Sequence, residues 1–169
     1  MMKVEKTNLE GVLIIDPPTN FQDIRGSYIE LYNEALYKKH GITQNFIQDD
    51  VSTSKFNVLR GIHGDLLTSK LVSCLYGEFY LVVVNNNPSS IQYKQWQSFH
   101  LSDVNRKQVL IPPMHGNGHL VLSNLAIFHY KQTTEYNREG QFTIMWNDPE
   151  LNISWPSKNP ILSKRDAGL

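Results

Sequence analysis

Short apolar segments separated by turn-forming residues recur along the whole chain and restrict its fold most strongly. NNNPSS (residues 85–90) and PPMHGNG (112–118) are two of the intervening turns. By this pattern, strands are predicted within residues 11–16, 26–33, 45–54, 57–63, 69–85, 96–102, 107–112, 116–134 and 141–148. Only residues 33–41, NEALYKKHG, have the composition of a helix, with a glycine where it should end. We therefore expect an all-β sandwich or barrel, specifically a jelly roll with one or two short helices.

The length and composition indicate a single domain spanning residues 1–169. A chain of this size forms one core, and 40% of its residues are hydrophobic. The sequence has no internal repeat, linker or low-complexity tract. Lys plus Arg and Asp plus Glu both total 16, so no overall charge favours nucleic acid or an acidic membrane as a partner. Any anion site must be built from a few placed basic residues.

The single cysteine and the N-terminal segment bear on the cellular compartment. Cys74 is the only cysteine, so no intrachain disulfide can form, which fits a reducing compartment. It lies within KLVSCLYGEFYLVVV, where we expect it to pack in the core rather than act as a nucleophile. The N-terminal apolar run is short and is broken by charge and proline, unlike a signal peptide or membrane span. We expect a cytoplasmic protein.

Strand alternation places two reactive side chains among core residues. In SKLVSCLY, Lys70 shares a face with Val72, and in AIFHYKQ, Tyr130 shares a face with Phe128. If Val72 and Phe128 point into the barrel, Lys70 and Tyr130 point inward with them. A lysine and a tyrosine inside a barrel need polar partners or a ligand, so the pattern predicts a site there.

His63 stands at the end of the apolar segment NVLRGIH. Arg60 and Lys70 flank it in the sequence, and the nearest carboxylate along the chain is Asp65. Two interpretations remain open from the residues alone: a surface histidine at a strand end, or a functional group beside basic residues.

The other histidines have simpler interpretations. His40 is expected at a helix end, and His100 and His129 on solvent-facing positions of strands. His115 and His119 flank GNG and are expected in a loop. Metal-binding jelly rolls usually present two histidines one residue apart plus a carboxylate. No His-x-His occurs in the sequence, so we expect no metal site.

An ordered set of motifs resembles the dTDP-4-dehydrorhamnose 3,5-epimerase family. It includes DIRGSYIELYN, FIQDD, NVLRGIH, SKLVSCLYGEFYLVVV, SFHLSDVNRKQVLIPP, AIFHYKQTTEYNREGQFTIMWNDPELNISWP and PILSKRDA, and covers nearly the whole chain. The resemblance implies a cupin-type jelly roll that is active without metal or organic cofactor. It also implies a homodimer in which the N-terminal strands help to build the partner's site.

The chemistry of a 4-keto sugar explains the residue types that the resemblance assigns. The C4 carbonyl acidifies the hydrogens on C3 and C5, so inversion needs a base, an acid on the other face and a donor near O4. By resemblance, His63 is the base, and Asp166 is the carboxylate that orients it. Tyr130 matches the acid, and Lys70 matches an active-site lysine that we assign to enolate stabilisation. The strand alternation had already pointed Lys70 and Tyr130 inward.

Further residues match the family's substrate-binding positions. Arg60 and Arg25 match arginines that bind the nucleotide diphosphate, for which a guanidinium is well suited. Glu30 and Gln48 match other substrate contacts, and Tyr28 falls where the family has aromatics near the base. The alternative interpretation of Arg25, Glu30 and Gln48 is ordinary polarity on a sheet face.

The chain departs from the family pattern at several site positions. Gly64 and Asp65 follow His63 where an aromatic and a glutamine are usual, Leu81 replaces an aspartate, and Asn117 replaces a histidine. Asn117 can still bind a carbonyl or hydroxyl, but it is a poor proton carrier. RGIHGD with PPMHGNGH looks more like the branch acting on GDP-4-keto heptoses in capsule biosynthesis. We therefore predict an epimerase of C3, C5 or both on a GDP-linked 4-keto heptose.

Four alternatives remain. The first is a 3,5-epimerase of dTDP-4-keto-6-deoxyglucose, and the second a 3,4-ketoisomerase of the same kind of substrate. The third is a catalytically silent nucleotide-sugar binding module, and the fourth a metal-dependent cupin oxygenase.

Overall fold

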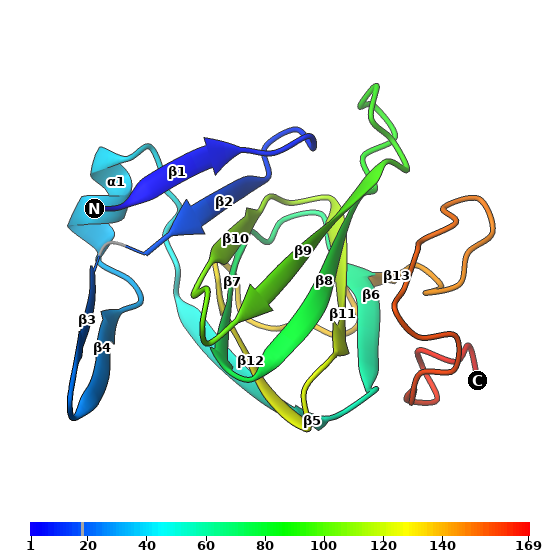
Figure 1. The fold of residues 1–169 in the computed structure, drawn as a ribbon. Helices are drawn as coiled ribbons and strands as arrows, with labels where there is room; N and C mark the ends of the chain where they lie inside the picture. Colours follow the sequence, from blue (N-terminus) through cyan, green and yellow to red (C-terminus); the bar gives the residue numbers. More distant parts are fainter. Residues whose placement is uncertain (18) are drawn as a thin grey trace.

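The protein is a barrel formed by two facing antiparallel sheets (Figure 1). The computed structural model describes residues 1–17 and 19–169. One sheet has the strand order β1-β2-β10-β7-β12-β5, and the other has the order β13-β6-β11-β8-β9. A separate hairpin joins β3 to β4. The strands are β1 (Lys3–Lys6), β2 (Leu13–Asp16), β3 (Thr19–Asp23), β4 (Gly26–Glu30), β5 (Gln48–Lys55), β6 (Leu59–Gly64), β7 (Lys70–Tyr76), β8 (Glu78–Asn85), β9 (Trp96–Ser102), β10 (Gln108–Ile111), β11 (His115–Val121), β12 (Leu125–Gln132) and β13 (Phe142–Thr143).

The main core lies between the two sheets, as the strand alternation requires. Val72 and Cys74 of β7 and Phe128 of β12 pack there against Phe79 and Leu81 of β8. All five side chains are buried. The prediction of an all-β jelly roll is therefore confirmed, and Cys74 is a packing residue whose burial raises its thiol pKa to about 12.

The helix α1 (Glu34–Lys39) packs beside the six-stranded sheet. Asn33 begins it, because its Oδ1 accepts a hydrogen bond from the Leu36 N–H at 3.2 Å. Tyr37 is fully buried, and its hydroxyl lies 2.5 Å from Oε1 of Gln108 on β10. The predicted helix over residues 33–41 is confirmed, with Gly41 in the left-handed region at φ +86° just after its end. None of the described residues forms a helix long and apolar enough to cross a membrane.

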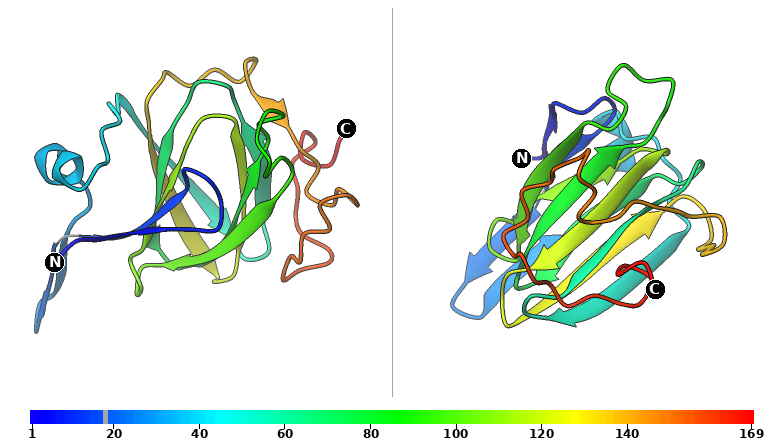
Figure 2. Two further views of the ribbon diagram at one scale, coloured as in Figure 1. Left: turned by 90° about the horizontal axis from the view of Figure 1, so that it is seen from above. Right: turned by 90° about the vertical axis from the view of Figure 1, so that its right-hand side faces the viewer.

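The N-terminal hairpin and the C-terminal segment lie on opposite sides of the barrel (Figure 2). The β3–β4 hairpin extends away from the barrel and exposes Phe21, Ile24 and Tyr28. The C-terminal segment runs over the outer face of the five-stranded sheet, where Leu151 packs with Ile62. Its later part returns to β6, and this return brings residues 163–166 to the cavity described below.

Three details differ from the predicted elements. The predicted strand at 141–148 pairs only over Phe142–Thr143, because the apolar side chains that follow, such as Ile144, pack on the sheet face instead. Strands β1 and β3 were not predicted, since KVEK and TNFQD are short and largely polar. These segments become strands by pairing with β2 and β4.

Candidate active site

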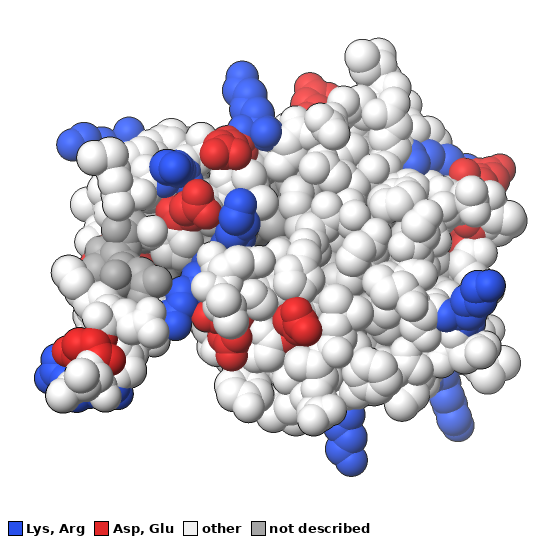
Figure 3. Space-filling model, viewed as in Figure 1, with Lys and Arg blue, Asp and Glu red and all other residues white. Residues whose placement is uncertain are grey.

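A cavity of about 350 Å³ lies between the two sheets and contains most of the predicted catalytic groups. Strands β6 and β11 supply one wall, β5, β7 and β12 supply the other, and residues 136–141 and 163–166 complete the lining. The charged or ionisable residues that line it include Arg60, His63, Lys70, Tyr130, Arg165 and Asp166. On the face of the protein seen in Figure 3, by contrast, charges of both signs are scattered without a basic patch.

His63 and Asp166, 103 positions apart in sequence, are in direct contact. Nε2 of His63 lies 2.7 Å from Oδ1 of Asp166, whose side chain is only 4% exposed. Ser163 Oγ donates a hydrogen bond to Asp166 Oδ2 at 2.9 Å. Burial alone would raise the pKa of Asp166, but His63, Ser163 and the Gly61 N–H outweigh it and lower that pKa. The carboxylate is therefore ionised, and it favours a proton on Nε2, which leaves Nδ1 of His63 as the free basic nitrogen.

Lys70 and Tyr130 lie on neighbouring strands of the opposite sheet. Lys70 is 9% exposed, and its Nζ lies 5.6 Å from the centre of the Tyr130 ring. Burial lowers the pKa of Lys70, while Asp65 and Asp50 partly offset this effect. Burial and then the nearby Asp50 carboxylate raise the pKa of Tyr130, so its hydroxyl keeps its proton at neutral pH. The cavity thus combines a desolvated ammonium with a phenolic proton donor.

Asn117 and Arg60 lie on the same wall of the cavity as His63 and face the wall that carries Lys70 and Tyr130. In the pairing of β11 with β6, Asn117 stands opposite His63. The Oδ1 of Asn117 lies 3.5 Å from Nζ of Lys70, so Asn117 is close to both His63 and Lys70. Arg60 lines the cavity and donates from Nε to Ser54 Oγ at 2.8 Å, and its terminal nitrogens form no hydrogen bond with any residue that the structure describes, so they are available to a ligand.

Four of the predicted substrate-binding residues do not line this cavity. Arg25, Tyr28 and Glu30 belong to the projecting hairpin, where Arg25 forms an ion pair with Asp23 at the exposed turn. Gln48 does not line the cavity, but its Oε1 accepts a hydrogen bond at 3.0 Å from the N–H of Tyr136, which does. A single chain therefore brings together His63, Asp166, Lys70, Tyr130, Arg60 and Asn117, but not the hairpin residues.

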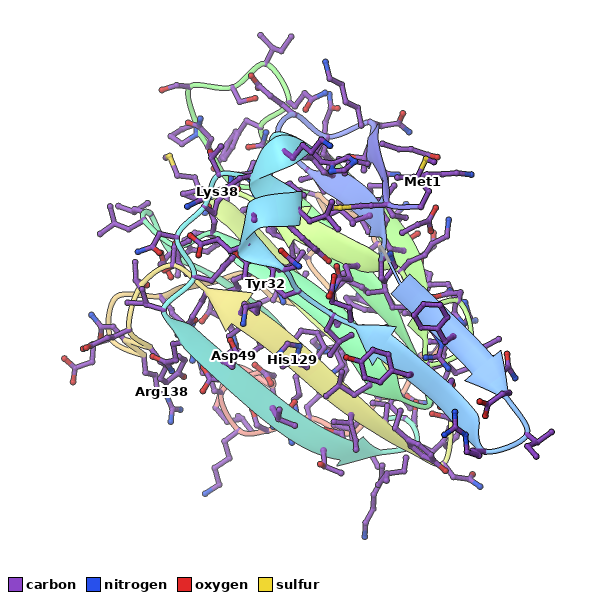
Figure 4. The ribbon with its side chains drawn as sticks, turned by 90° about the vertical axis from the view of Figure 1, so that its left-hand side faces the viewer. Met1, Tyr32, Lys38, Asp49, His129 and Arg138 are labelled. Atoms are coloured by element: carbon purple, nitrogen blue, oxygen red, sulfur yellow. The ribbon has the colours of Figure 1, made fainter. Side chains whose placement is uncertain are left out.

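Three predicted environments for histidines were wrong. His115 and His119 lie in strand β11, not a loop, because Gly116 and Gly118 pass closely against Ile62 in the sheet. His119 lines the cavity and is 3% exposed. His129 is 8% exposed and contacts Asp49 at 3.3 Å between β12 and β5 (Figure 4).

Several cavity residues were not identified from the sequence. Arg165 adjoins Asp166 in the motif LSKRDA, so its place beside the cavity could have been inferred from that neighbour. Tyr136, Arg138 and Gln141 come from the irregular segment after β12, which has no periodic pattern. No three His, Cys, Asp or Glu side chains of the described residues cluster as metal ligands would.

Comparisons with known proteins agree on one family. The family model of dTDP-4-dehydrorhamnose 3,5-epimerase matches residues 6–169. The enzyme of that name from Escherichia coli K12 is 39% identical over 173 residues, covering 99% of this chain and 93% of the relative.

Two solved structures share the fold closely. The dTDP-6-deoxy-D-glucose-3,5-epimerase of Legionella pneumophila Philadelphia 1, in complex with dTDP-4-keto-L-rhamnose, has a TM-score of 0.94 and 37% identity. The alignment covers 99% of this chain and 91% of that one. The dTDP-4-dehydrorhamnose 3,5-epimerase of Bacillus anthracis Ames, with TDP and PPi bound, has a TM-score of 0.93 and 35% identity. It covers 98% of this chain and 97% of the other.

Proposed function

The chain belongs to the dTDP-4-dehydrorhamnose 3,5-epimerase family, and on this premise we propose that it inverts C3 and C5 of a dTDP-linked 4-keto-6-deoxyhexose. The chain is an isomerase acting on sugar nucleotides. The observation that carries the proposal is the placement of His63 and Tyr130. They enter one cavity from opposite sheets, so one can act on each face of a sugar ring.

Proton abstraction is assigned to His63. Nδ1 removes the proton from the carbon next to the carbonyl, and the C–H electron pair moves into an enolate whose negative charge rests on O4. The imidazolium that forms lies against the Asp166 carboxylate, 2.7 Å away, which stabilises its positive charge. Burial of Asp166 keeps this charge from being screened by water.

Enolate stabilisation and reprotonation are assigned to the opposite sheet. The Lys70 ammonium has no carboxylate within ion-pair distance among the described residues, so its charge is available to O4. The Tyr130 hydroxyl then delivers a proton to the face opposite His63, which inverts the carbon. Before the second carbon reacts, His63 must release its proton to solvent and Tyr130 must regain one, and the same two steps then complete the double inversion.

The substrate's diphosphate is assigned to Arg60, with Arg165 and Arg138 at the same cavity. A guanidinium presents paired N–H donors that match phosphate oxygens. Arg165 is held toward the cavity by Gln141, whose Oε1 accepts from Nη1 at 3.1 Å. These arginines form a local anion site in a chain of zero formal net charge.

The dTDP-linked substrate is better supported than the GDP-linked heptose that the sequence favoured. The relatives described above act on, or were solved with, thymidine-linked ligands according to their names. One departure, Gly64, also has a packing explanation. A Cβ at this position would overlap the carbonyl oxygen of His115 and lie 2.6 Å from the Phe142 ring. The glycine is thus required by neighbouring residues and need not reflect a different sugar.

We also propose that the enzyme is a homodimer in which the β3–β4 hairpin reaches the partner's cavity. Arg25 lies on a hairpin that extends away from its own barrel and exposes Phe21 and Tyr28, each 68% exposed. Apolar side chains on a projecting hairpin favour burial against another chain.

Complementation tests this arrangement. Arg25→Ala and His63→Asn proteins, each impaired alone, are unfolded together and refolded as a mixture. A mixed dimer has one intact site if Arg25 serves the partner, so random pairing restores about a quarter of wild-type activity. A mixture no more active than its two components would show that Arg25 does not complete the partner's site.

Deuterium exchange tests the proposed reaction. The protein is incubated in deuterated water with dTDP-4-keto-6-deoxyglucose and, separately, with a GDP-4-keto heptose, and C3 and C5 are followed by NMR. We expect deuterium at both carbons of the dTDP-linked sugar. Exchange only with the GDP-linked sugar would support the heptose alternative, and a product with its carbonyl at C3 would indicate a ketoisomerase. Nucleotide binding without exchange in either sugar would indicate a silent binding module.

A further inference from the structure

His119 is a buried polar residue of the cavity that the steps above do not use. It is 3% exposed, and its Nε2 is buried without a hydrogen-bond partner among the described residues. A buried polar atom left without a partner destabilises the folded protein.

The neighbours of His119 hold its ring in one plane. The imidazole stacks on Phe128 with ring centres 4.1 Å apart and an interplanar angle of 9°. Phe79 lies on another side at 5.1 Å, and Leu81 is its cross-strand neighbour on β8. These three neighbours are apolar, and His119 borders the cavity. No described residue forms a hydrogen bond with the ring, and because His119 lines the cavity, a bound ligand can supply the missing polar partner.

The charge state of His119 suits a hydroxyl partner. Burial, and then the positive charge of Arg60, lower the pKa of His119 to about 3. The imidazole is neutral at physiological pH, with one nitrogen as a donor and the other as an acceptor. A neutral ring of this kind matches a sugar hydroxyl, which also donates and accepts.

The strand register locates His119 along the bound sugar. In the pairing of β11 with β6, Asn117 stands opposite His63, whereas His119 stands opposite Arg60. His63 is assigned to the carbons that are inverted, and Arg60 to the diphosphate on C1. His119 therefore lies toward the anomeric end of the sugar, where C2 is the next carbon.

We propose that His119 hydrogen-bonds the 2-hydroxyl of the sugar and makes the enzyme selective for substrates that carry it. This inference rests on the proposed epimerase function. A 4-keto-6-deoxyhexose has hydroxyls only on C2 and C3, and the C3 hydroxyl changes direction during inversion. A ring fixed by Phe128 suits the hydroxyl that stays in place.

The test compares a 2-hydroxy substrate with its 2-deoxy analogue in three proteins. Wild type, His119→Phe and His119→Gln are assayed for kcat/KM by deuterium exchange at C5. Phenylalanine keeps the stacking on Phe128 but removes both ring nitrogens, whereas glutamine keeps a donor and an acceptor. We expect His119→Phe to lower kcat/KM about tenfold for the 2-hydroxy sugar and to leave the 2-deoxy sugar unchanged. His119→Gln should retain part of the selectivity.

The ratio of the kcat/KM values for the two sugars, measured with the same protein sample, does not depend on what fraction of that sample is folded. An equal loss with both sugars, or no loss with either, would overturn the assignment of His119. Wild-type turnover of the dTDP-linked 2-hydroxy sugar reports separately on the proposed function. If wild type turns over only GDP-linked sugars, the same pair of analogues on GDP gives the ratio that tests His119.

Discussion

Replacement of Asp166 by asparagine should disable proton abstraction while leaving the cavity intact. The side chains have nearly the same shape, and Ser163 Oγ can still donate to the amide oxygen. The amide removes the negative charge that faces Nε2 of His63. It also removes the preference for a proton on that nitrogen, so Nδ1 is no longer kept free to accept one.

The size of the effect follows from the contact distance. Two unit charges 2.7 Å apart interact by about 6 kcal/mol at an effective dielectric constant of about 20. His63 is 22% exposed, and Asp166 already accepts a hydrogen bond from Ser163, so we take about half of that value. A loss of about 3 kcal/mol in stabilisation of the imidazolium corresponds to a rate reduction of about 100-fold.

The assay is the initial rate of deuterium incorporation at C3 and C5, measured with saturating substrate. Glu78→Gln is the matched control, because Glu78 Oε2 also lies 2.7 Å from a histidine nitrogen, that of His100, but on the exposed surface. We expect the control to exchange at the wild-type rate. An Asp166→Asn protein that exchanges within about threefold of wild type would refute the role of the carboxylate in proton abstraction.

Three further perturbations address the opposite wall and the packing around the base. Tyr130→Phe should retain deuterium exchange on the His63 face but lose inversion by about 100-fold; equal loss of both in the NMR assay would show that Tyr130 is not a separate acid. Lys70→Met should abolish most activity yet raise Tm by about 3 °C at pH 7, because burial lowers the pKa of Lys70 and makes its charged form costly to fold. Calorimetry should show this gain in Tm shrinking as pH rises from the lowered pKa of Lys70 toward its ordinary value of 10.5, because the lysine of the unfolded chain then also loses its proton. A gain in Tm that does not change with pH would contradict this explanation. Gly64→Ala should destabilise the protein by about 1–3 kcal/mol in urea unfolding, since its Cβ would overlap the His115 carbonyl, and an unchanged midpoint would show that this contact relaxes freely.

The inward direction of the reactive strand residues was predictable from the sequence. Successive side chains of a strand point to opposite faces, so core residues Val72 and Phe128 determine the direction of Lys70 and Tyr130 two positions away. The period of two is local, and it requires no knowledge of which strands pair. The same local rules correctly predicted the fold class and the short helix α1.

Burial of individual histidines was not predictable in the same way. His119 follows a glycine-rich stretch that is typical of a loop, but the glycines allow β11 to pass closely against Ile62. His129 alternates with apolar residues, but neighbouring strands and Asp49 cover it. Whether a polar residue is exposed depends on which segments pack over it, and those segments are distant in the sequence.

The sequence by itself determined the strand pattern, the direction of side chains within each strand and, through its ordered motifs, the family. Only the tertiary structure decided which side chains meet. His63 and Asp166 come into contact because the segment after β13 buries its apolar residues on the outer face of the five-stranded sheet and then returns to β6. The tertiary structure likewise separated Arg25 from its own cavity by projecting the β3–β4 hairpin outward. The physical reason is that alternation is a property of neighbouring residues, whereas a site is made by long-range packing that no local pattern encodes.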